Sequence, residues 1–305
     1  MKTAFLFSGQ GSQYIGMGQD LYEKEPLVKE YFDKASSILG YDLAEICFNN
    51  EELLNQTKYT QPAIFTLSIA ILKVLEQKGL SAEVLAGLSL GEYSALVASG
   101  SLTFEEGLEL VKKRSQLMAA AVEPGKGKMV AVLNTPVQVI EDVCSKISGV
   151  SIANYNTPKQ IVIGGESQMV DETVNRLREA GVKKIIPLNV SGPFHTPMYA
   201  SVAKDLRDIF DDMTWQPMKI PVIGNVEAKA LLDEKLLDLL SQQVMKPVRF
   251  YESIEEFGRM GVERVVEIGP GKTLTSFVKR IDKTIATYNV ENIESLQALV
   301  DSWEG

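Results

Sequence analysis

Short runs of apolar residues alternate along the chain with longer segments in which apolar residues recur every three or four positions. The short runs predict buried strands, and those in the two terminal parts of the chain cover residues 3–7, 84–87, 220–223 and 262–268. The periodic segments predict helices between them, among them residues 27–39, 61–78, 103–122 and 233–244. Because helices and strands alternate, we expect an α/β body with a largely parallel sheet.

The middle of the chain follows a different order of elements. After a break at Pro124-Gly125-Lys126-Gly127, the pattern predicts strand, helix, strand, strand, helix and strand at residues 129–133, 136–147, 150–155, 160–163, 167–180 and 183–188. This β-α-β-β-α-β order is that of ferredoxin-like domains. We therefore predict a large α/β-hydrolase-like domain, residues 1–124 and 191–305, into which a small ferredoxin-like domain, residues 125–190, is inserted.

A Gly-x-Ser-x-Gly motif, residues 87–91, joins one predicted strand to the helix that follows it. A serine on such a sharp turn has a cramped backbone, so residues without a Cβ are needed on both sides, and Gly87 and Gly91 supply them. The turn presents the hydroxyl at a helix N-terminus, where free N–H groups favour negative charge. We interpret the motif as a nucleophile elbow with Ser89 as the nucleophile. The alternative is a glycine-containing loop without chemistry.

A nucleophilic serine needs a base, and the chain contains one histidine, His195. If the base is an imidazole, it is therefore His195, although a lone histidine is more often an ordinary surface or core residue. The backbone N–H of Leu90, directly after the nucleophile, is expected to donate a hydrogen bond to a developing oxyanion. The turn at Gln10, after the first predicted strand, is the local candidate for the second donor.

Composition excludes several classes of function. The formal net charge of −9 argues against broad binding to nucleic acid or to anionic membranes. Charges interrupt every apolar run well before the about twenty residues that a membrane-spanning helix needs. Cys47 and Cys144 are isolated and indicate neither a disulfide framework nor a zinc site. No signal peptide is indicated, so we expect a cytoplasmic protein. We also expect no metal and no redox cofactor.

Two glycine-rich turns fail the patterns of nucleotide-binding loops. Tyr14 stands where the dinucleotide fingerprint requires its third glycine, and Val266 stands where a phosphate-binding loop requires its first. In parallel sheets, however, ligands collect at the carboxyl ends of the strands, where both turns and the elbow lie.

The turn around Gln10, the elbow, Arg114 and the segment around His195 follow one another in the order seen in the acyl transferases of fatty-acid and polyketide synthesis. Residues 154–165 and 243–250 also resemble segments of that family. The resemblance extends over nearly the whole chain, which looks like a free-standing malonyl-CoA:acyl-carrier-protein transacylase. The ordered set of motifs is much more specific than the elbow alone.

The resemblance implies a role for each of these residues. Ser89 would carry the malonyl ester, His195 would be the general base, and Gln10 with the amide of Leu90 would form the oxyanion hole. Arg114 would hold the malonyl carboxylate, because a planar guanidinium pairs with a carboxylate through two hydrogen bonds. The alternative for Arg114 is a solvated helix face beside two lysines.

Three further residues match positions of interest in the family. Gln243 matches the residue whose backbone carbonyl orients the histidine, so its side chain is not required, and the alternative is an exposed glutamine at a helix end. Leu88 replaces the histidine that usually precedes the nucleophile, which puts the polarity of the pocket and its acyl selectivity in doubt. Phe194 resembles the malonyl-selecting form of polyketide acyl transferases, so we expect malonyl over methylmalonyl.

The resemblance therefore implies ping-pong transfer of malonyl from malonyl-CoA to the phosphopantetheine thiol of holo acyl carrier protein, without a cofactor. The alternatives are a serine hydrolase or thioesterase, a trans-acting polyketide acyl transferase with another acyl preference, and a non-enzymatic carrier-docking subunit. Carrier proteins of this pathway are acidic, like this chain, so docking requires a local basic patch, for which Lys183-Lys184 and Lys279-Arg280 are candidates. We expect a monomer.

Overall fold

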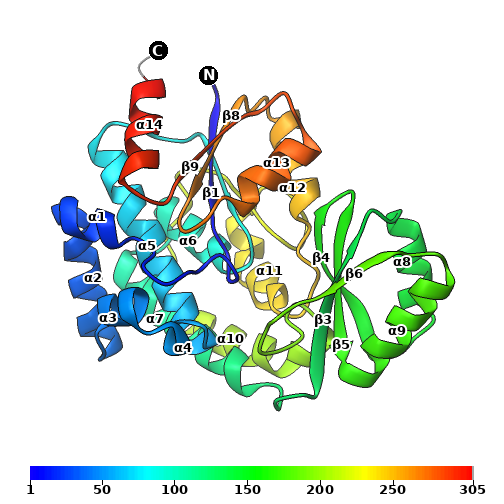
Figure 1. Cartoon of the computed structure of the whole chain (residues 1–305). Coiled ribbons are helices and arrows are strands. Elements are labelled where there is room, and N and C mark those ends of the chain that lie inside the picture. Colours follow the sequence, from blue (N-terminus) through cyan, green and yellow to red (C-terminus); the bar gives the residue numbers. More distant parts are fainter. Residues whose placement is uncertain (304–305) are drawn as a thin grey trace.

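A parallel five-stranded sheet lies at the centre of the larger part of the molecule (Figure 1). The computed structural model describes residues 1–303. The strand order is β7-β2-β1-β8-β9, with bounds Val222–Ile223, Val84–Gly87, Thr3–Phe7, Arg264–Ile268 and Ala286–Val290. Every neighbouring pair is parallel, as expected from the alternation of helices and strands. The edge strand β9 was not anticipated, because its residues are mostly half-buried and lack an apolar run.

Apolar side chains cover both faces of this sheet. In β1, Phe5 and Phe7 enter one hydrophobic cluster while Ala4 and Leu6 enter another on the opposite face. Such burial on both faces is typical of parallel sheets, and it explains the continuous apolar runs. The α-helices of this part of the chain are α1 Gln19–Lys24, α2 Pro26–Leu39, α3 Leu43–Asn49, α4 Glu51–Leu54, α5 Thr57–Gln77, α6 Leu90–Ala98, α7 Phe104–Ala120, α10 Ala200–Asp211, α11 Leu236–Gln243, α12 Phe250–Arg259, α13 Thr273–Ile281 and α14 Ile293–Trp303.

The helices predicted from the sequence pattern are present in the structure, but they begin and end at somewhat different residues. The capping box predicted before α7 is present: the Thr103 side chain accepts from the Glu106 N–H, and the Glu106 side chain accepts from the Thr103 N–H. Helix α5 begins four residues before the predicted start, at Thr57. Before α11, residues Asp233–Lys235 form a short 3-10 turn. Within residues 1–303, no helix is both long enough and apolar enough to cross a membrane.

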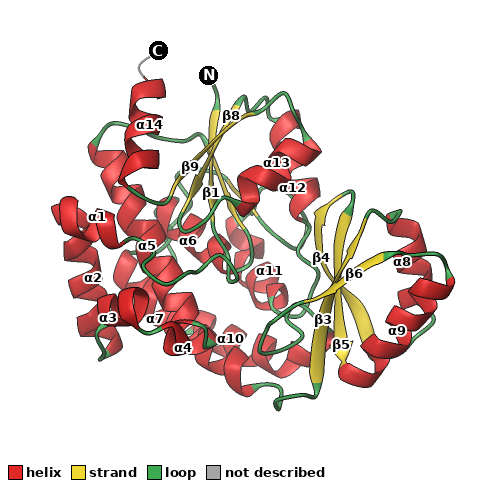
Figure 2. Cartoon of the chain, viewed as in Figure 1, coloured by secondary structure: helices red, strands yellow, loops and turns green. Residues whose placement is uncertain are grey.

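The middle of the chain forms a second, antiparallel sheet of four strands in the order β4-β5-β3-β6. These strands are β3 Gly127–Leu133, β4 Val150–Thr157, β5 Gln160–Glu166 and β6 Lys184–Pro187, and the helices between them are α8 Val137–Cys144 and α9 Ser167–Glu179. Figure 2 shows both helices on the same side of this sheet. Large side chains such as Val132 and Ile163 face the helices, whereas Ala131 and Val162 join the core of the larger part.

Two contacts fasten the antiparallel sheet to the rest of the molecule. A Cβ on Gly127 would lie 2.2 Å from a ring carbon of Pro193, so the two segments that connect the sheets touch where they cross. On the sheet edge, the Tyr155 N–H donates to the Val248 carbonyl at 2.8 Å, and the Val248 N–H donates to the Ala153 carbonyl at 2.9 Å. The inner face of the antiparallel sheet is therefore held close to the carboxyl edge of the parallel sheet.

Candidate active site

Ser89 lies on a strained turn between β2 and α6. Its φ of 54° and ψ of −103° are unusual for a residue with a side chain. A Cβ on Gly87 would lie 2.0 Å from the carbonyl carbon of Gly91, and a Cβ on Gly91 would lie 2.1 Å from the carbonyl oxygen of Phe7. The prediction that both positions require glycine is confirmed.

Asn225 holds this turn from the neighbouring strand, and sequence reasoning missed it. Its Oδ1 accepts a hydrogen bond from the Ser89 N–H at 2.7 Å, and its Nδ2 donates to the Gly87 carbonyl at 2.7 Å. The side chain is buried. Asn225 stands two residues after the end of the predicted strand at 220–223, at the same sheet edge as the elbow, and that position was the available signal.

His195 joins the elbow from the segment that leaves the antiparallel sheet. Its Nε2 lies 2.7 Å from Ser89 Oγ, and its Nδ1 lies 2.7 Å from the Gln243 carbonyl oxygen. Because a carbonyl can only accept, Nδ1 carries the proton, and the lone pair of Nε2 faces the serine hydroxyl. Burial lowers the pKa of His195 to about 4, against the effect of the hydrogen bond to the Gln243 carbonyl, and the nearby Arg114 charge lowers it further. The imidazole is therefore neutral and able to accept a proton at neutral pH.

Arg114 is fully buried beside the serine, so the alternative of a solvated helix face is wrong. Its Nη1 donates to Gln61 Oε1 at 2.7 Å, and its Nη2 donates to Ser89 Oγ at 3.1 Å and to Gln243 Oε1 at 3.0 Å. The guanidinium carbon lies 4.9 Å from the centre of the Tyr93 ring. Among residues 1–303, no carboxylate oxygen lies within 4.0 Å of the guanidinium nitrogens. A buried cation without an ion-pair partner is suited to receive an anionic group.

Gln243 contributes its side chain as well as its carbonyl, and the alternative of an exposed helix-end glutamine is wrong. The residue is fully buried, and its Nε2 donates to the Ser89 carbonyl at 2.9 Å and to Glu92 Oε2 at 2.7 Å. Glu92 was also missed, although a carboxylate within the apolar helix α6 was a visible signal. Burial raises the pKa of Glu92 to about 7, against the effects of hydrogen bonds from Gln243 and Asn225 and of the Arg114 charge.

Gln10 lies in the turn that follows β1, next to the elbow. A Cβ on Gly9 would lie 2.4 Å from the Leu88 carbonyl oxygen, so the two loops touch. The Gln10 side chain donates to Thr57 Oγ1 at 3.0 Å and accepts from Gln61 Nε2 at 3.1 Å. Leu90 is the first residue of α6, so its N–H has no partner within the helix. Both backbone segments expected to form the oxyanion hole therefore lie beside Ser89.

Leu88 and Phe194 flank the serine and the histidine in sequence. Leu88 is half-buried and lines a cavity of 170 Å³ between the two sheets, together with Gln10 and Val162. Phe194 is buried, and its ring centre lies 5.5 Å from that of Tyr199. The position before the nucleophile is therefore apolar.

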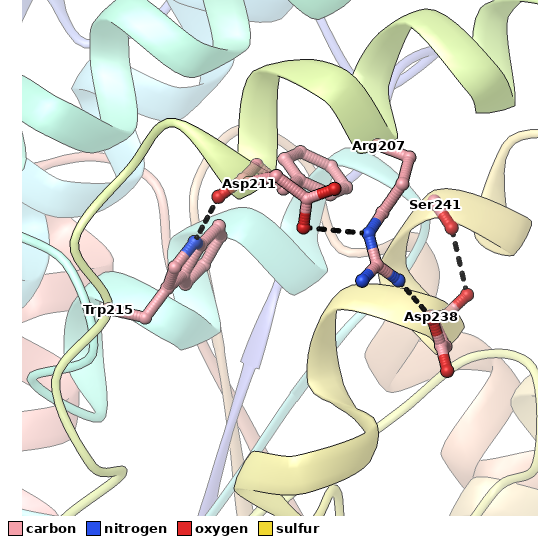
Figure 3. A network of polar contacts seen from close by, with 6 residues as sticks. Arg207, Asp211, Trp215, Asp238 and Ser241 are labelled. Atoms are coloured by element: carbon pink, nitrogen blue, oxygen red, sulfur yellow. Dashed lines mark hydrogen bonds and ion pairs between the residues drawn. The ribbon is translucent and has the colours of Figure 1, made fainter.

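A surface network links α10, which follows the His195 segment, to α11, which ends at Gln243 (Figure 3). Arg207 of α10 pairs with Asp211 on its own helix at 3.0 Å and with Asp238 of α11. These charges are exposed, so the pairs align the helices and contribute little stability.

Lysines and arginines from distant segments gather around a second, larger cavity of 640 Å³. Five of its lining residues are Lys159, Lys184, Lys279, Arg280 and Lys283, which we call the basic cluster. None of them forms an ion pair within residues 1–303. The structure thus brings one residue of the predicted Lys183-Lys184 pair together with the Lys279-Arg280 pair, while Lys183 lines an adjacent cavity.

Metal binding has no visible basis in the described part of the chain. Across residues 1–303, no three histidine, cysteine, aspartate or glutamate side chains are grouped so that they could hold a metal ion.

Comparison with known proteins gives a consistent result. Residues 4–300 match a family model described as "acyl transferase domain". The chain is 39% identical over 307 residues to the malonyl CoA-acyl carrier protein transacylase of Bacillus subtilis, covering 99% of this chain and 97% of that protein. The crystal structure of MCAT from Streptococcus pneumoniae is 51% identical, with a TM-score of 0.96 over 99% of this chain and 100% of that one.

A further solved structure contains a partner protein. It is described as a type II PKS acyl-carrier protein in complex with its malonyl-transacylase, and the matching chain is 36% identical, with a TM-score of 0.96. The match covers 99% of this chain and 100% of that chain.

Proposed function

This chain belongs to the acyl transferase family, and from this premise we propose that it transfers malonyl from malonyl-CoA to the thiol of holo acyl carrier protein. The observation that carries the proposal is the contact between a buried, unpaired guanidinium and the nucleophile, 3.1 Å from Arg114 Nη2 to Ser89 Oγ. An acyl group bound to Ser89 and ending in a carboxylate would meet this cation. The product is malonyl-acyl carrier protein, the extender of fatty-acid or polyketide chains.

The first half-reaction follows from the Ser89–His195 pair. Ser89 Oγ attacks the thioester carbonyl of malonyl-CoA while His195 Nε2 takes the hydroxyl proton. The oxyanion accepts hydrogen bonds from the Leu90 N–H and the Gln10 turn. When the carbon–sulfur bond breaks, His195 returns the proton to the sulfur of coenzyme A, and malonyl-Ser89 remains. The Gln243 carbonyl keeps the imidazole in the required tautomer throughout.

The second half-reaction reverses these steps with a different thiol. His195 takes the proton of the phosphopantetheine thiol, the sulfur attacks the Ser89 ester, and Ser89 recovers the proton as the bond breaks. No cofactor takes part. Leu88 and Phe194 would set acyl selectivity by shape, since neither can offer a charge to the substrate.

The basic cluster is the proposed docking site for the carrier protein. Five unpaired cations are unusual on a chain with a formal net charge of −9, and their charge is opposite to that of an acidic carrier. The cluster combines residues of the antiparallel sheet and of the α13 region, and these two regions also line part of the cavity of 170 Å³ beside Leu88.

We also propose an assignment of the two parts of the fold to known types of domain. The parallel sheet with its elbow supports an α/β-hydrolase-like domain formed by residues 1–124 and 191–305. The β3-α8-β4-β5-α9-β6 order supports a ferredoxin-like domain at residues 125–190. The active site then lies between the two domains. That the protein acts as a monomer, and that it is cytoplasmic, stay predictions.

The experiment for the malonyl assignment compares acyl donors in matched variants. We expect malonyl-CoA to leave one malonyl group on Ser89, detected by intact mass, with acetyl-CoA and methylmalonyl-CoA much poorer. Arg114→Ala should lower kcat/KM for malonyl-CoA at least about 100-fold, because removing one partner of a buried ion pair costs about 3–5 kcal/mol. Lys113→Ala is the control, since Lys113 is the neighbouring cation on α7 and is exposed.

Two outcomes would contradict the assignment. Equal use of acetyl-CoA and malonyl-CoA by the wild type would refute the role of Arg114. Rapid loss of the malonyl adduct to water, without transfer to the carrier thiol, would favour the serine hydrolase alternative.

A further inference from the structure

Glu92 is linked to Arg114 through the side-chain amide of Gln243. Gln243 Nε2 donates to Glu92 Oε2 at 2.7 Å, and Gln243 Oε1 accepts from Arg114 Nη2 at 3.0 Å. All three side chains are buried, Glu92 being 1% exposed and the other two 0%. We call Glu92, Gln243 and Arg114 the amide relay.

The contacts of Gln243 are compatible with only one orientation of its amide. In the observed orientation its two N–H groups meet two acceptors, Glu92 and the Ser89 carbonyl, and its oxygen meets a cation. Rotation of the amide by half a turn would place the NH₂ group against Arg114 and the oxygen against Glu92 and the Ser89 carbonyl. Every hydrogen bond would then be replaced by a repulsion between buried groups. Glu92 is the side-chain acceptor that sets this orientation, together with the Ser89 carbonyl.

The orientation of the amide decides where the guanidinium points. Arg114 Nη2 is shared between Gln243 Oε1 and Ser89 Oγ, so the amide oxygen helps to aim this nitrogen at the nucleophile. The acceptors of Arg114 are neutral oxygens, and the Gln243 amide stands between it and the Glu92 carboxyl. The cation is thereby oriented without being neutralised and keeps its charge for a substrate.

We propose that Glu92 is a positioning residue for acyl selection: by holding the Gln243 amide it aims Arg114 at the acyl group on Ser89 and favours acyl groups that end in a carboxylate. The inference rests on the proposed function. The Glu92 side chain forms no hydrogen bond with Ser89 Oγ or with His195. The polar contacts of the Glu92 side chain are the Gln243 amide, at 2.7 Å, and the Asn225 N–H, at 3.2 Å. It therefore acts on selectivity and leaves the serine–histidine chemistry intact.

The test measures the ratio of kcat/KM for malonyl-CoA to kcat/KM for acetyl-CoA. In Glu92→Met the ratio should fall about tenfold, the effect of losing one charge-assisted hydrogen bond. Glu92→Gln should keep the ratio within about threefold, because an amide oxygen can still accept from both Gln243 and Asn225. Labelling of Ser89 by phenylmethylsulfonyl fluoride, which has no carboxylate, should change little in either variant.

A second buried glutamate provides the matched control. Glu267 accepts backbone hydrogen bonds from Leu274 and Thr275 at the start of α13 and makes no polar contact with the relay. Like that of Glu92, its pKa is raised to about 7 by burial. Glu267→Met should lower stability without changing the malonyl-to-acetyl ratio. An equal fall of the ratio in this variant would refute the proposal.

Gln243→Met provides a second variant in case Glu92→Met folds poorly. It keeps the backbone carbonyl for His195 and removes the side-chain amide of the relay, so it should lower the ratio at least as much as Glu92→Met. Since Glu92 acts through Gln243, adding Glu92→Met to Gln243→Met should cause no further fall. An unchanged ratio in Gln243→Met, or a fall in Ser89 labelling equal to the loss of malonyl transfer, would overturn the proposal. Failure of the wild type to form malonyl-Ser89 would refute the proposed function instead.

Discussion

The active site and the basic cluster differ in how each arranges its charges. At the active site, Arg114 is fully buried, and both of its terminal nitrogens donate to side chains that hold them in place. In the basic cluster, Lys279 and Arg280 are exposed and carry no ion pair within the described residues. Chemistry requires groups that are held in place before the substrate arrives, whereas docking of a charged protein needs only long-range attraction. The two regions should therefore respond to different perturbations.

The largest effect is expected when His195 is replaced, and it should be confined to the active site. His195→Ala should slow labelling of Ser89 by phenylmethylsulfonyl fluoride by about 10³-fold, the usual contribution of a positioned general base. The same variant should bind holo acyl carrier protein with an unchanged Kd, since the basic cluster is untouched. If His195→Ala abolished carrier binding as well as the labelling of Ser89, the two regions would not be independent.

The pH dependence of the same labelling reaction tests how far the active site is isolated from water. Because burial lowers the pKa of His195 to about 4, the imidazole stays neutral at pH 5, and the acid limb of the profile should lie near pH 4. An exposed histidine would be only about 3% neutral at pH 5, so labelling there should be about 30-fold faster than for an unshifted residue. An acid limb near pH 6.5 would contradict the burial of the pair.

The same shift fixes the sign of the contribution of His195 to stability. The folded-state pKa is lower than the unfolded value of 6.5, so the unfolded chain binds more protons between these two values. The contribution is therefore fully present above about pH 6.5 and is lost as the pH falls toward 4. The raised pKa of Glu92 acts in the opposite direction: its contribution is lost as the pH rises toward 7.

The smallest effect is expected in the basic cluster. Charge reversal of Lys279 and Arg280 to glutamate should weaken carrier binding by about tenfold at low salt, with a smaller loss at high salt where charges are screened. Labelling of Ser89 should not change. The control reverses Lys146, which is exposed in the loop before β4, and Arg178, which is exposed on α9, and it gives the same net charge. Equal weakening by both double variants would place docking outside the cluster.

The polar contacts around the elbow show which kinds of residue can be found from the sequence pattern alone. Ser89 was identifiable because its strand, its two glycines and its helix are contiguous, and Gly87 and Gly91 are needed for local steric reasons. His195 was identifiable by elimination, as the only imidazole. Arg114 was assigned through a family resemblance, since its sequence neighbours are lysines and nothing local indicates that it is buried.

Other residues had no such local signal. Asn225 and Gln243 lie 136 and 154 positions from the serine that they contact, and the atoms of Ser89 that they meet are backbone atoms, which every sequence possesses. Gln243 was expected to contribute its carbonyl alone, and the packing of α11 against the elbow also buried its side chain. Lys184 and Lys279 line the same cavity for a similar reason, since their proximity depends on how the two sheets pack.

The sequence by itself determined the alternation of helices and strands, the elbow and the choice of its proposed base, because these depend on apolar periodicity, on backbone sterics and on the presence of a single histidine. The tertiary structure decided that Arg114 is buried and that Gln243 links it to Glu92. It also decided that five separated cations face one cavity. These features depend on contacts between segments far apart in the chain, and whether a polar side chain meets a partner or water is settled only when those segments pack.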